Sequence, residues 1–294
     1  MPGRSTHSGV IVGVDGSPSS TTAAKWAAHQ ATMHGVGLTV VHVTSPLVIR
    51  PGVPLPAALS REHKERARRV IADAIRAAED GAPENNRPEI DSKLVCAAPV
   101  PTLIELSEEA YMVVVGCRGQ DAPERILLGS VSTGLIQHAH CPVAVIHAEA
   151  PIPLGSSQLP VLVGVDGSRA SDLATAIAFD EASFRGVDLV AVHAWTDSDT
   201  SGVLSKEWSA LQSRAAEILS ERLAGWQERY PDVTVHRRLV LDRPARHLLE
   251  ESESAQLVVV GSHGRGGFAG MSLGSVSNAV AHAARIPVIV ARGD

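Results

Sequence analysis

The sequence predicts an α/β protein made of two tandem doubly wound domains, each with a five-stranded parallel sheet and helices on both faces. Three observations predict this fold class. The 294-residue chain repeats itself once, and short runs of valine and isoleucine alternate with longer amphipathic segments. Hydrophobic residues make up 44% and charged residues 20%, which supplies enough apolar surface for two cores. Continuous apolar runs are typical of strands buried on both faces, and helices between them imply a parallel sheet with right-handed crossovers.

The repeat is defined by motifs that return at a nearly fixed spacing. VIVGVDGSPSS, which contains Asp15, returns 151 residues later as VLVGVDGSRAS around Asp166. MVVVGCRG, which ends at Gly119, returns 145 residues later as LVVVGSHG, which ends at Gly264. The six extra residues of the first half are assigned to its proline-rich loop after the second strand. We therefore place the domains at residues 1–150 and 151–294, joined by a linker rich in Pro, Gly and Ser.

Each half is predicted to alternate five strands with four helices. In the first half the apolar runs predict strands at 10–14, 38–43, 91–96, 112–115 and 143–146. The segments between them predict helices at 19–34, 60–80, 101–109 and 131–139. The last strand of each half is predicted to be an edge that can pair the halves or two chains.

Composition restricts the class of partner. A net charge of −6 and a pI near 6.1 argue against nucleic acid or a membrane surface, and 3% aromatic residues argue against base-stacking platforms. The apolar runs are too short to span a bilayer, and the first residues lack the apolar region of a signal peptide. Cys96, Cys117 and Cys141 lack CxxC spacing, which is typical of reduced thiols. We therefore expect a cytoplasmic location.

The loop after the fourth strand predicts an anion site in both halves, because it carries the pattern Gly-x2-Gly-x9-Gly-Ser. The residues of this pattern in the first half are Gly116, Cys117, Arg118, Gly119, Gly129, Ser130, Val131 and Ser132. In the second half they are Gly261, Ser262, His263, Gly264, Arg265, Gly266, Gly267, Gly274, Ser275, Val276 and Ser277. Glycines let backbone N–H groups approach a phosphate, the following helix N-terminus favours negative charge, and the serine hydroxyls add donors. A plain turn followed by a serine cap explains the same residues without a ligand, and this alternative stays open.

Two better-known phosphate motifs do not fit this loop. A Walker P-loop needs a lysine after its last glycine, and no lysine follows these glycines. A dinucleotide fingerprint belongs after the first strand of its unit, with an acid about 20 residues further on. Here the loop follows the fourth strand, and no acid follows Gly264 before Asp294. NAD is therefore disfavoured.

Acidic residues end the first strand of each half, beside this loop in the expected strand order. Asp15 and Asp166 follow Gly13 and Gly164 by two residues. Ligands of open α/β sheets bind beyond the carboxyl ends of the strands, and a carboxylate there can accept hydrogen bonds from a ribose or adenine, or lie near a phosphate-bound metal. An Asx turn is the alternative reading of Asp-Gly-Ser. For the histidines that close the second strands, packing is the favoured role. No cluster of protein metal ligands and no catalytic residues are predicted.

The spacing motif in two copies, each behind VGVDGS, resembles the ATP-binding branch of the universal stress protein family. The likeness covers nearly the whole chain and is similar to tandem two-domain actinobacterial members. It implies an adenine nucleotide α-hydrolase-like fold with one ATP site per domain, between the ends of the first and fourth strands. It further implies that Asp15 and Asp166 contact the ribose or base, and that the backbone near Val41 and Val192 recognises adenine. By the same resemblance, the loop glycines and serines bind the phosphates, and Mg²⁺ is an optional ion bound with the phosphates. Asp197 is a further implied ribose ligand, and a homodimer is the implied assembly.

We therefore predict an ATP-binding regulatory protein of the stress response with little or no ATP turnover. Two alternatives stay open: a slow ATPase or phosphotransferase that uses Asp15 or Asp166, and an interaction scaffold without nucleotide. The first loop carries Asp121, Pro123 and Glu124 where the second has no acid and more glycine. Carboxylates close to a triphosphate repel it, so we expect the second site to bind ATP more tightly.

Overall fold

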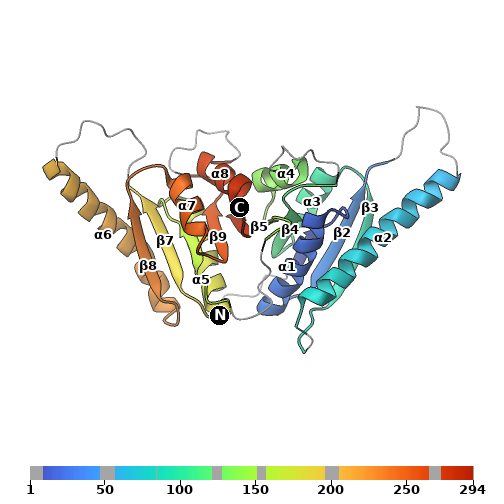
Figure 1. Cartoon of the computed structure of the whole chain (residues 1–294), viewed down its shortest axis with the longest axis horizontal. Coiled ribbons are helices and arrows are strands. Elements are labelled where there is room, and N and C mark those ends of the chain that lie inside the picture. The colour runs from blue at the N-terminus through green and yellow to red at the C-terminus, as the bar shows by residue number, and fades with distance from the viewer. Residues whose placement is uncertain are drawn as a thin grey trace. The chain divides into compact units, whose positions relative to one another are not determined.

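Two compact units make up the chain, Met1–Ile152 with Asp294, and Pro153–Gly293. The computed structural model describes residues 9–46, 57–83, 85–120, 128–150, 157–195, 205–264 and 273–293. Within these ranges each unit has five strands and four helices in alternation, and the ladders within each unit are parallel (Figure 1). The predicted fold class is confirmed.

The first unit has the strand order β3-β2-β1-β4-β5. Its elements in chain order are β1 (Val10–Gly13), α1 (Pro18–His34), β2 (Leu38–Thr44), α2 (Ala57–Gly81), β3 (Ile90–Cys96), α3 (Pro99–Ser107), β4 (Met112–Gly116), α4 (Ser130–His138) and β5 (Val143–Ile146). The central strand β1 pairs with β2 on one side and β4 on the other, with Val12 opposite Val40 and Val114. The chain therefore changes direction across the sheet between β1 and β4, which is the switch point where ligands of such sheets bind.

The second unit repeats this order as β8-β7-β6-β9-β10. Its elements are β6 (Val161–Gly164), α5 (Arg169–Arg185), β7 (Leu189–Ala194), α6 (Ser205–Arg229), β8 (Val235–Val240), α7 (Pro244–Ser252), β9 (Leu257–Gly261), α8 (Ser275–Ala283) and β10 (Val288–Ala291). The switch point of this unit lies between β6 and β9.

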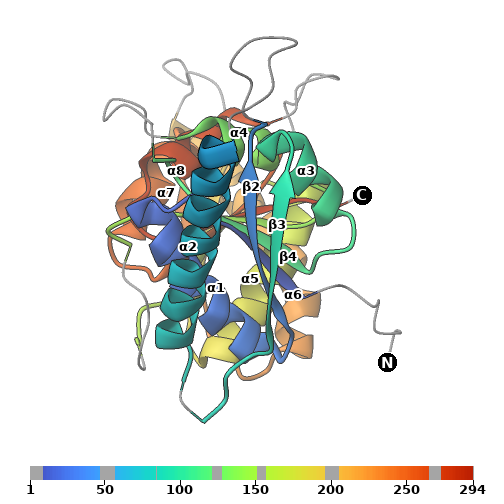
Figure 2. The same cartoon turned by 90° about the vertical axis from the view of Figure 1, so that its right-hand side faces the viewer.

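Helices cover both faces of each sheet, as Figure 2 shows for the first unit, where α1 packs against α2 and α3 against α4. The strand side chains between these layers form the core, and Val10, Val12 and Val114 have no exposed surface. The long helix α2 begins at Ala57, three residues before the predicted start at Ser60. Ser60 therefore lies within the first turns of the helix.

The two units differ in how their long helices pack. A Cβ on Gly81 of α2 would lie 2.5 Å from the carbonyl oxygen of Lys25, so only glycine lets α2 lie this close to α1. The 145-residue spacing of the repeat places Trp226 of α6 at the position of Gly81. Its ring stacks with those of Phe179 and Tyr230 at centroid distances of 6.1 and 6.3 Å. These rings lie between α5 and α6, whereas α2 packs directly on α1.

Candidate functional site

An Asx turn follows the central strand of each unit and fixes the predicted aspartate. Oδ1 of Asp15 accepts a hydrogen bond of 2.9 Å from the N–H of Ser17, and Oδ1 of Asp166 accepts one of 2.9 Å from Ser168. The glycine between them has φ of +85° in the first unit and +80° in the second, a conformation that favours glycine. The Asx turn expected as the alternative role is thus present. It occupies only one of the two carboxylate oxygens.

The second glycine of each loop lies directly against the other carboxylate oxygen. A Cβ on Gly119 would lie 2.8 Å from Oδ2 of Asp15, and one on Gly264 would lie 2.6 Å from Oδ2 of Asp166. Both distances are shorter than any van der Waals contact. The fold therefore brings the aspartate and the glycine loop together in both units, and glycine is required where they meet.

The first glycine of each loop makes room for a helix N-terminus. A Cβ on Gly116 would lie 2.5 Å from Oγ of Ser19, and one on Gly261 would lie 2.7 Å from the carbonyl carbon of Ala170. These residues stand in the first turns of α1 and α5. In each loop, the first two glycines were expected to admit an anion. A close contact with the protein itself accounts for the lack of a side chain at each of them.

Serine hydroxyls hold the main chain of each loop. In the first unit, Ser17 and Ser19 donate to the carbonyl oxygen of Arg118 at 3.2 and 2.5 Å. In the second unit, Ser168 donates to the carbonyl oxygen of His263 at 3.1 Å, and the position of Ser19 is taken by Ala170. Among the described residues, the first loop therefore has one anchoring hydroxyl more than the second.

The far end of each loop folds back onto its beginning. The N–H of Gly129 donates to the carbonyl oxygen of Cys117, and that of Gly274 to Ser262, each at 2.7 Å. The predicted phosphate donor Ser132 is buried and gives its proton to the carbonyl oxygens of Cys117 and Gly129. Its equivalent, Ser277, is also buried and donates to the carbonyl oxygen of Gly261. In this structure the loop carbonyls take the protons of both hydroxyls, and the phosphate-donor role of Ser132 and Ser277 stays a prediction.

The helices that open after the loops have no side-chain cap. Gly129 and Gly274 are the N-caps of α4 and α8, and within the described residues no side chain accepts a hydrogen bond from either N-terminal turn. The first helical hydrogen bonds are those of Thr133 to Gly129 and Asn278 to Gly274. In contrast, α1 and α5 are capped by the hydroxyls of Ser17 and Ser168. The amides of Ser130, Val131 and Ser132, and of Ser275, Val276 and Ser277, therefore lack helical partners.

Four further predicted residues belong to the strands that precede the aspartates and to the strands beside them. Gly13 and Gly164 end the central strands, and a Cβ there would press on Leu103 and Leu248 at 3.2 and 3.1 Å. Val41 and Val192 are buried inside β2 and β7, and their carbonyl oxygens accept hydrogen bonds from the N–H groups of Val14 and Val165. The strands continue past these two valines to Thr44 and Ala194, and the reading of adenine by the backbone near Val41 and Val192 stays a prediction.

The histidines of β2 and β7 support the strand that leads to the aspartate. Nδ1 of His42 lies 2.6 Å from the carbonyl oxygen of Val14, and Nδ1 of His193 lies 2.6 Å from that of Val165. Because a carbonyl only accepts, each Nδ1 is the donor. The two imidazoles therefore hold the backbone of the residue that precedes each aspartate. This hydrogen bond is the structural role of the two histidines.

Some predicted residues lie outside the described part of the chain. They are Asp197, Arg265, Gly266 and Gly267, together with the loop residues Asp121, Pro123 and Glu124.

Residues that the sequence analysis missed are Ser17, Ser19 and Ser168, which anchor the loops, and Gln120, whose N–H donates to Oδ2 of Asp15 at 2.9 Å. The signal was available for the serines, because two of them stand in the repeated motif beside the aspartate. For Gln120 no motif pointed to a role.

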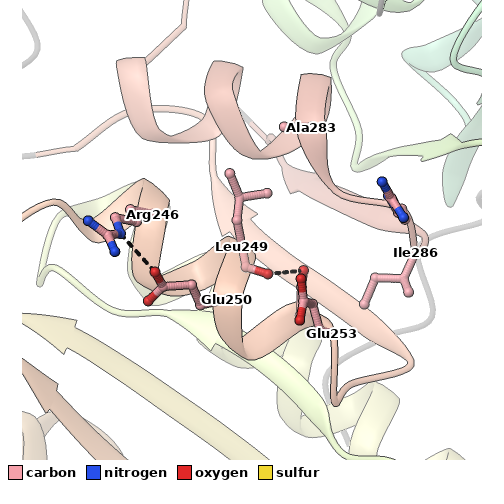
Figure 3. A pocket seen from close by; sticks show the side chains of 8 residues that line it. Arg246, Leu249, Glu250, Glu253, Ala283 and Ile286 are labelled. Carbon is pink, nitrogen blue, oxygen red and sulfur yellow. Dashed lines mark hydrogen bonds and ion pairs between the residues drawn. The ribbon is translucent and has the colours of Figure 1, made fainter.

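A separate hollow of about 770 Å³ lies between α7 and α8 of the second unit (Figure 3). Its lining includes Arg246, Glu250, Glu253 and Arg285. Nε of Arg246 lies 2.7 Å from Oε1 of Glu250, and His247 lies 3.4 Å from the other oxygen of Glu250. Arg246 and His247 thus both contact the Glu250 carboxylate, and the lining includes none of the repeated motif residues.

Neither metal ligands nor membrane-spanning helices mark another kind of site in the described ranges. No three His, Cys, Asp or Glu side chains there are grouped so as to hold a metal ion. None of the helices seen there is both long and apolar enough to cross a membrane.

Comparison with known proteins gives the family. The model of the universal stress protein family matches residues 8–147 and 159–292, one match per unit. Universal stress protein Rv2623 of Mycobacterium tuberculosis is 52% identical over 293 residues, which is 99% of both chains. Universal stress protein Rv2005c of the same organism is 54% identical over 290 residues, or 98% of both chains. The solved structure of a universal stress protein from Archaeoglobus fulgidus shares the fold, with a TM-score of 0.69 and 23% identity over 99% of both chains. The chain belongs to the universal stress protein family, with two tandem domains of that family.

Proposed function

We propose that this protein binds ATP at two sites, one per unit, as a regulatory ligand in the stress response. The observation that carries the proposal is the uncapped N-terminus of α4 and of α8, which directly follows a glycine loop that touches Asp15 or Asp166. Free helical amides and the helix dipole favour a phosphate at this place. A nearby carboxylate oxygen can accept the hydroxyl protons of a ribose, which suits a nucleotide better than inorganic phosphate.

The proposed division of the site follows from the geometry of each unit. The amides at the start of α4 and α8, with the exposed hydroxyls of Ser130 and Ser275, take the phosphates, and Mg²⁺ accompanies the phosphates where the cell supplies it. Oδ2 of Asp15 and of Asp166 takes the ribose. Adenine lies toward the ends of β2 and β7, beyond the buried Val41 and Val192.

ATP is proposed to be held with little or no turnover. Oδ1 of each aspartate accepts a backbone N–H in an Asx turn, and Oδ2 lies against a loop glycine. These contacts suit a carboxylate that positions a ligand. A general base for hydrolysis has to face a water molecule in line with the terminal phosphate.

Native mass spectrometry of the freshly purified full chain tests the proposal. Two adducts of ATP mass per chain are expected, and Asp15→Asn and Asp166→Asn should each remove one of them. The absence of adducts even with added ATP would leave an interaction scaffold. A parallel phosphate-release assay with Mg²⁺ should show little turnover, and turnover that is lost in both Asn variants would instead establish the slow ATPase.

The same proposal includes a cytoplasmic homodimer. All three cysteines are free thiols, which suits a reducing compartment. Cell fractionation tests the location, and light scattering coupled to size-exclusion chromatography tests the dimer. A chain found with the membrane fraction, or a mass equal to 30.8 kDa at micromolar concentration, would contradict these parts.

A further inference from the structure

A side chain from α2 reaches the glycine loop of the first unit. Nη2 of Arg66 donates to Oε1 of Gln120 at 2.9 Å. Gln120 is the residue after Gly119, and its own N–H donates to Oδ2 of Asp15 at 2.9 Å. Its Nε2 lies 3.5 Å from the carbonyl oxygen of Gly16. The guanidinium of Arg66 is therefore held beside both parts of the proposed nucleotide site, the aspartate turn and the glycine loop.

The packing of α2 places Arg66 there. A Cβ on Gly16 would lie 3.2 Å from a methyl carbon of Val70, so α2 passes directly over the aspartate turn. Ala67, the residue after Arg66, is buried against the unit, and Gly81 lets the other end of α2 rest on α1. Contacts near Val70 and at Gly81 thus fix the position of α2. Arg66 lies one turn before Val70, and its side chain extends from the helix toward the loop.

Arg66 hydrogen-bonds to a residue outside its own helix, although α2 has an acidic residue at ion-pair spacing. Glu62 lies four residues earlier on α2, a spacing at which ion pairs commonly form on helices. Among the residues that the structure describes, Gln120 is nevertheless the hydrogen-bond partner of Arg66. The exposed guanidinium is directed at the loop and keeps donors that Gln120 does not use.

In the second half of the sequence, the position equivalent to Arg66 is not an arginine, but the position equivalent to Gln120 is. The spacing of 145 residues that relates the loops places Leu211 opposite Arg66 and Arg265 opposite Gln120. By this spacing the helix position of the second half has no charge, and the residue directly after Gly264 has gained one. Each half therefore has one arginine at these two positions, on the helix in the first half and on the loop in the second. This exchange suggests that the site needs a cation, which either element can supply.

ATP supplies the chemistry that such a cation would meet. Its phosphate chain carries several negative charges, and no lysine follows the loop glycines. A guanidinium presents donors in a planar fork that matches phosphate oxygens. Resting on the ATP binding proposed above, we propose that Arg66 is the cationic ligand of the β- and γ-phosphates in the first site. Gln120 holds the guanidinium beside the loop.

Calorimetric titration of the full chain with ATP and with AMP tests this role. The chain carries Asp166→Asn, so that one site remains, and native mass spectrometry verifies the single adduct. Arg66→Gln should weaken ATP binding about tenfold or more, as expected for a lost charge-assisted hydrogen bond, and leave AMP binding unchanged because AMP lacks the outer phosphates. The double variant Arg66→Gln with Gln120→Arg moves the guanidinium to the loop position that Arg265 has in the second half, and it should restore most of the ATP affinity.

Arg68→Gln is the matched control, because Arg68 is an exposed arginine of the same helix with no ion pair or hydrogen bond among the described residues. It should bind ATP as the parent chain does. Unchanged ATP affinity in Arg66→Gln, an equal loss for AMP, or failure of the double variant to restore binding would each overturn the inference. A wild-type chain that binds no ATP would overturn the proposed function itself, which separates the two failures.

Discussion

Oδ2 of Asp15 accepts a 2.9 Å hydrogen bond from the backbone N–H of Gln120, a residue 105 positions later in the chain. This bond joins the turn after β1 to the loop after β4 across the switch point of the first sheet. The same approach is present in the second unit, where Gly264 lies against Asp166. The two motifs that the chain repeats are thus the two sides of one site, and predictions follow from the contacts between them.

A methyl group at the second loop glycine should damage one site at a time. In Gly119→Ala and Gly264→Ala the new Cβ would lie 2.8 and 2.6 Å from a carboxylate oxygen, so the aspartate or the loop must move. We expect each variant to lose ATP affinity at its own site, by about tenfold or more for a displaced hydrogen-bonding group. Because the second site is predicted to bind more tightly, Gly264→Ala should cause the larger total loss in a titration. A larger loss in Gly119→Ala would contradict the predicted order of affinities.

The extra hydroxyl of the first loop should stabilise that loop. Ser19→Ala removes the 2.5 Å hydrogen bond to the carbonyl oxygen of Arg118 and copies Ala170 of the second unit. We expect the free energy of unfolding to fall by about 1 kcal/mol, and amide exchange to become faster in the loop around Arg118. Ser17→Ala should cost more, because this hydroxyl also caps α1. Equal exchange rates in Ser19→Ala and wild type would show that Ser17 alone holds the loop.

A buried ion pair should make the second unit sensitive to one substitution. Glu181 and Arg185 of α5 lie 2.9 Å apart, and their side chains are 1% and 4% exposed. Glu181→Ala leaves the guanidinium buried without its carboxylate, and we expect a loss of about 3–5 kcal/mol in urea unfolding.

The control for that measurement is the exposed pair of Asp73 and Arg76 on α2. Asp73→Ala should cost about 1 kcal/mol or less. In the first unit Gln30 and His34 occupy the positions of Glu181 and Arg185 and hydrogen-bond at 2.9 Å. A double change of Glu181→Gln with Arg185→His should therefore be milder than Glu181→Ala. A small effect of Glu181→Ala would refute a structural role for the pair.

The cysteines should differ sharply in reactivity. Burial raises the pKa of the Cys141 thiol from 9.0 to about 12, while Cys96 is exposed at the end of β3. The raised pKa favours the neutral thiol in the fold, so its contribution to stability is present below pH 9.0 and is lost as the pH rises toward about 12. Iodoacetamide at pH 8 should label Cys96 in the native protein and reach Cys141 only after unfolding. Mass spectrometry of peptides checks this, and early labelling of Cys141 would contradict its burial.

The fold class could be predicted from the sequence because its signals are local or periodic. The apolar runs that became β1, β4 and β5 are buried on both faces, so they contain little but valine, isoleucine and small residues. The duplication doubled each signal, and the family resemblance added the expected strand order. The helix start at Ala57 was missed because Ala57, Ala58 and Leu59 directly follow the proline-rich loop and have no residue that marks a helix start.

By itself the sequence determined two domains of alternating strands and helices, with a repeated aspartate turn and a repeated glycine loop. Only the tertiary structure decided what each residue of these motifs touches. Gly116 makes room for a helix, Gly119 for a carboxylate, and Ser132 gives its proton to the loop, although all three stand in one motif. The packing of α2, with Val70 over Gly16 and Gly81 against α1, brings Arg66 to this loop. The physical reason is that hydrogen bonds and steric contacts between residues about a hundred positions apart depend on how elements pack, and periodicity and propensity do not encode that.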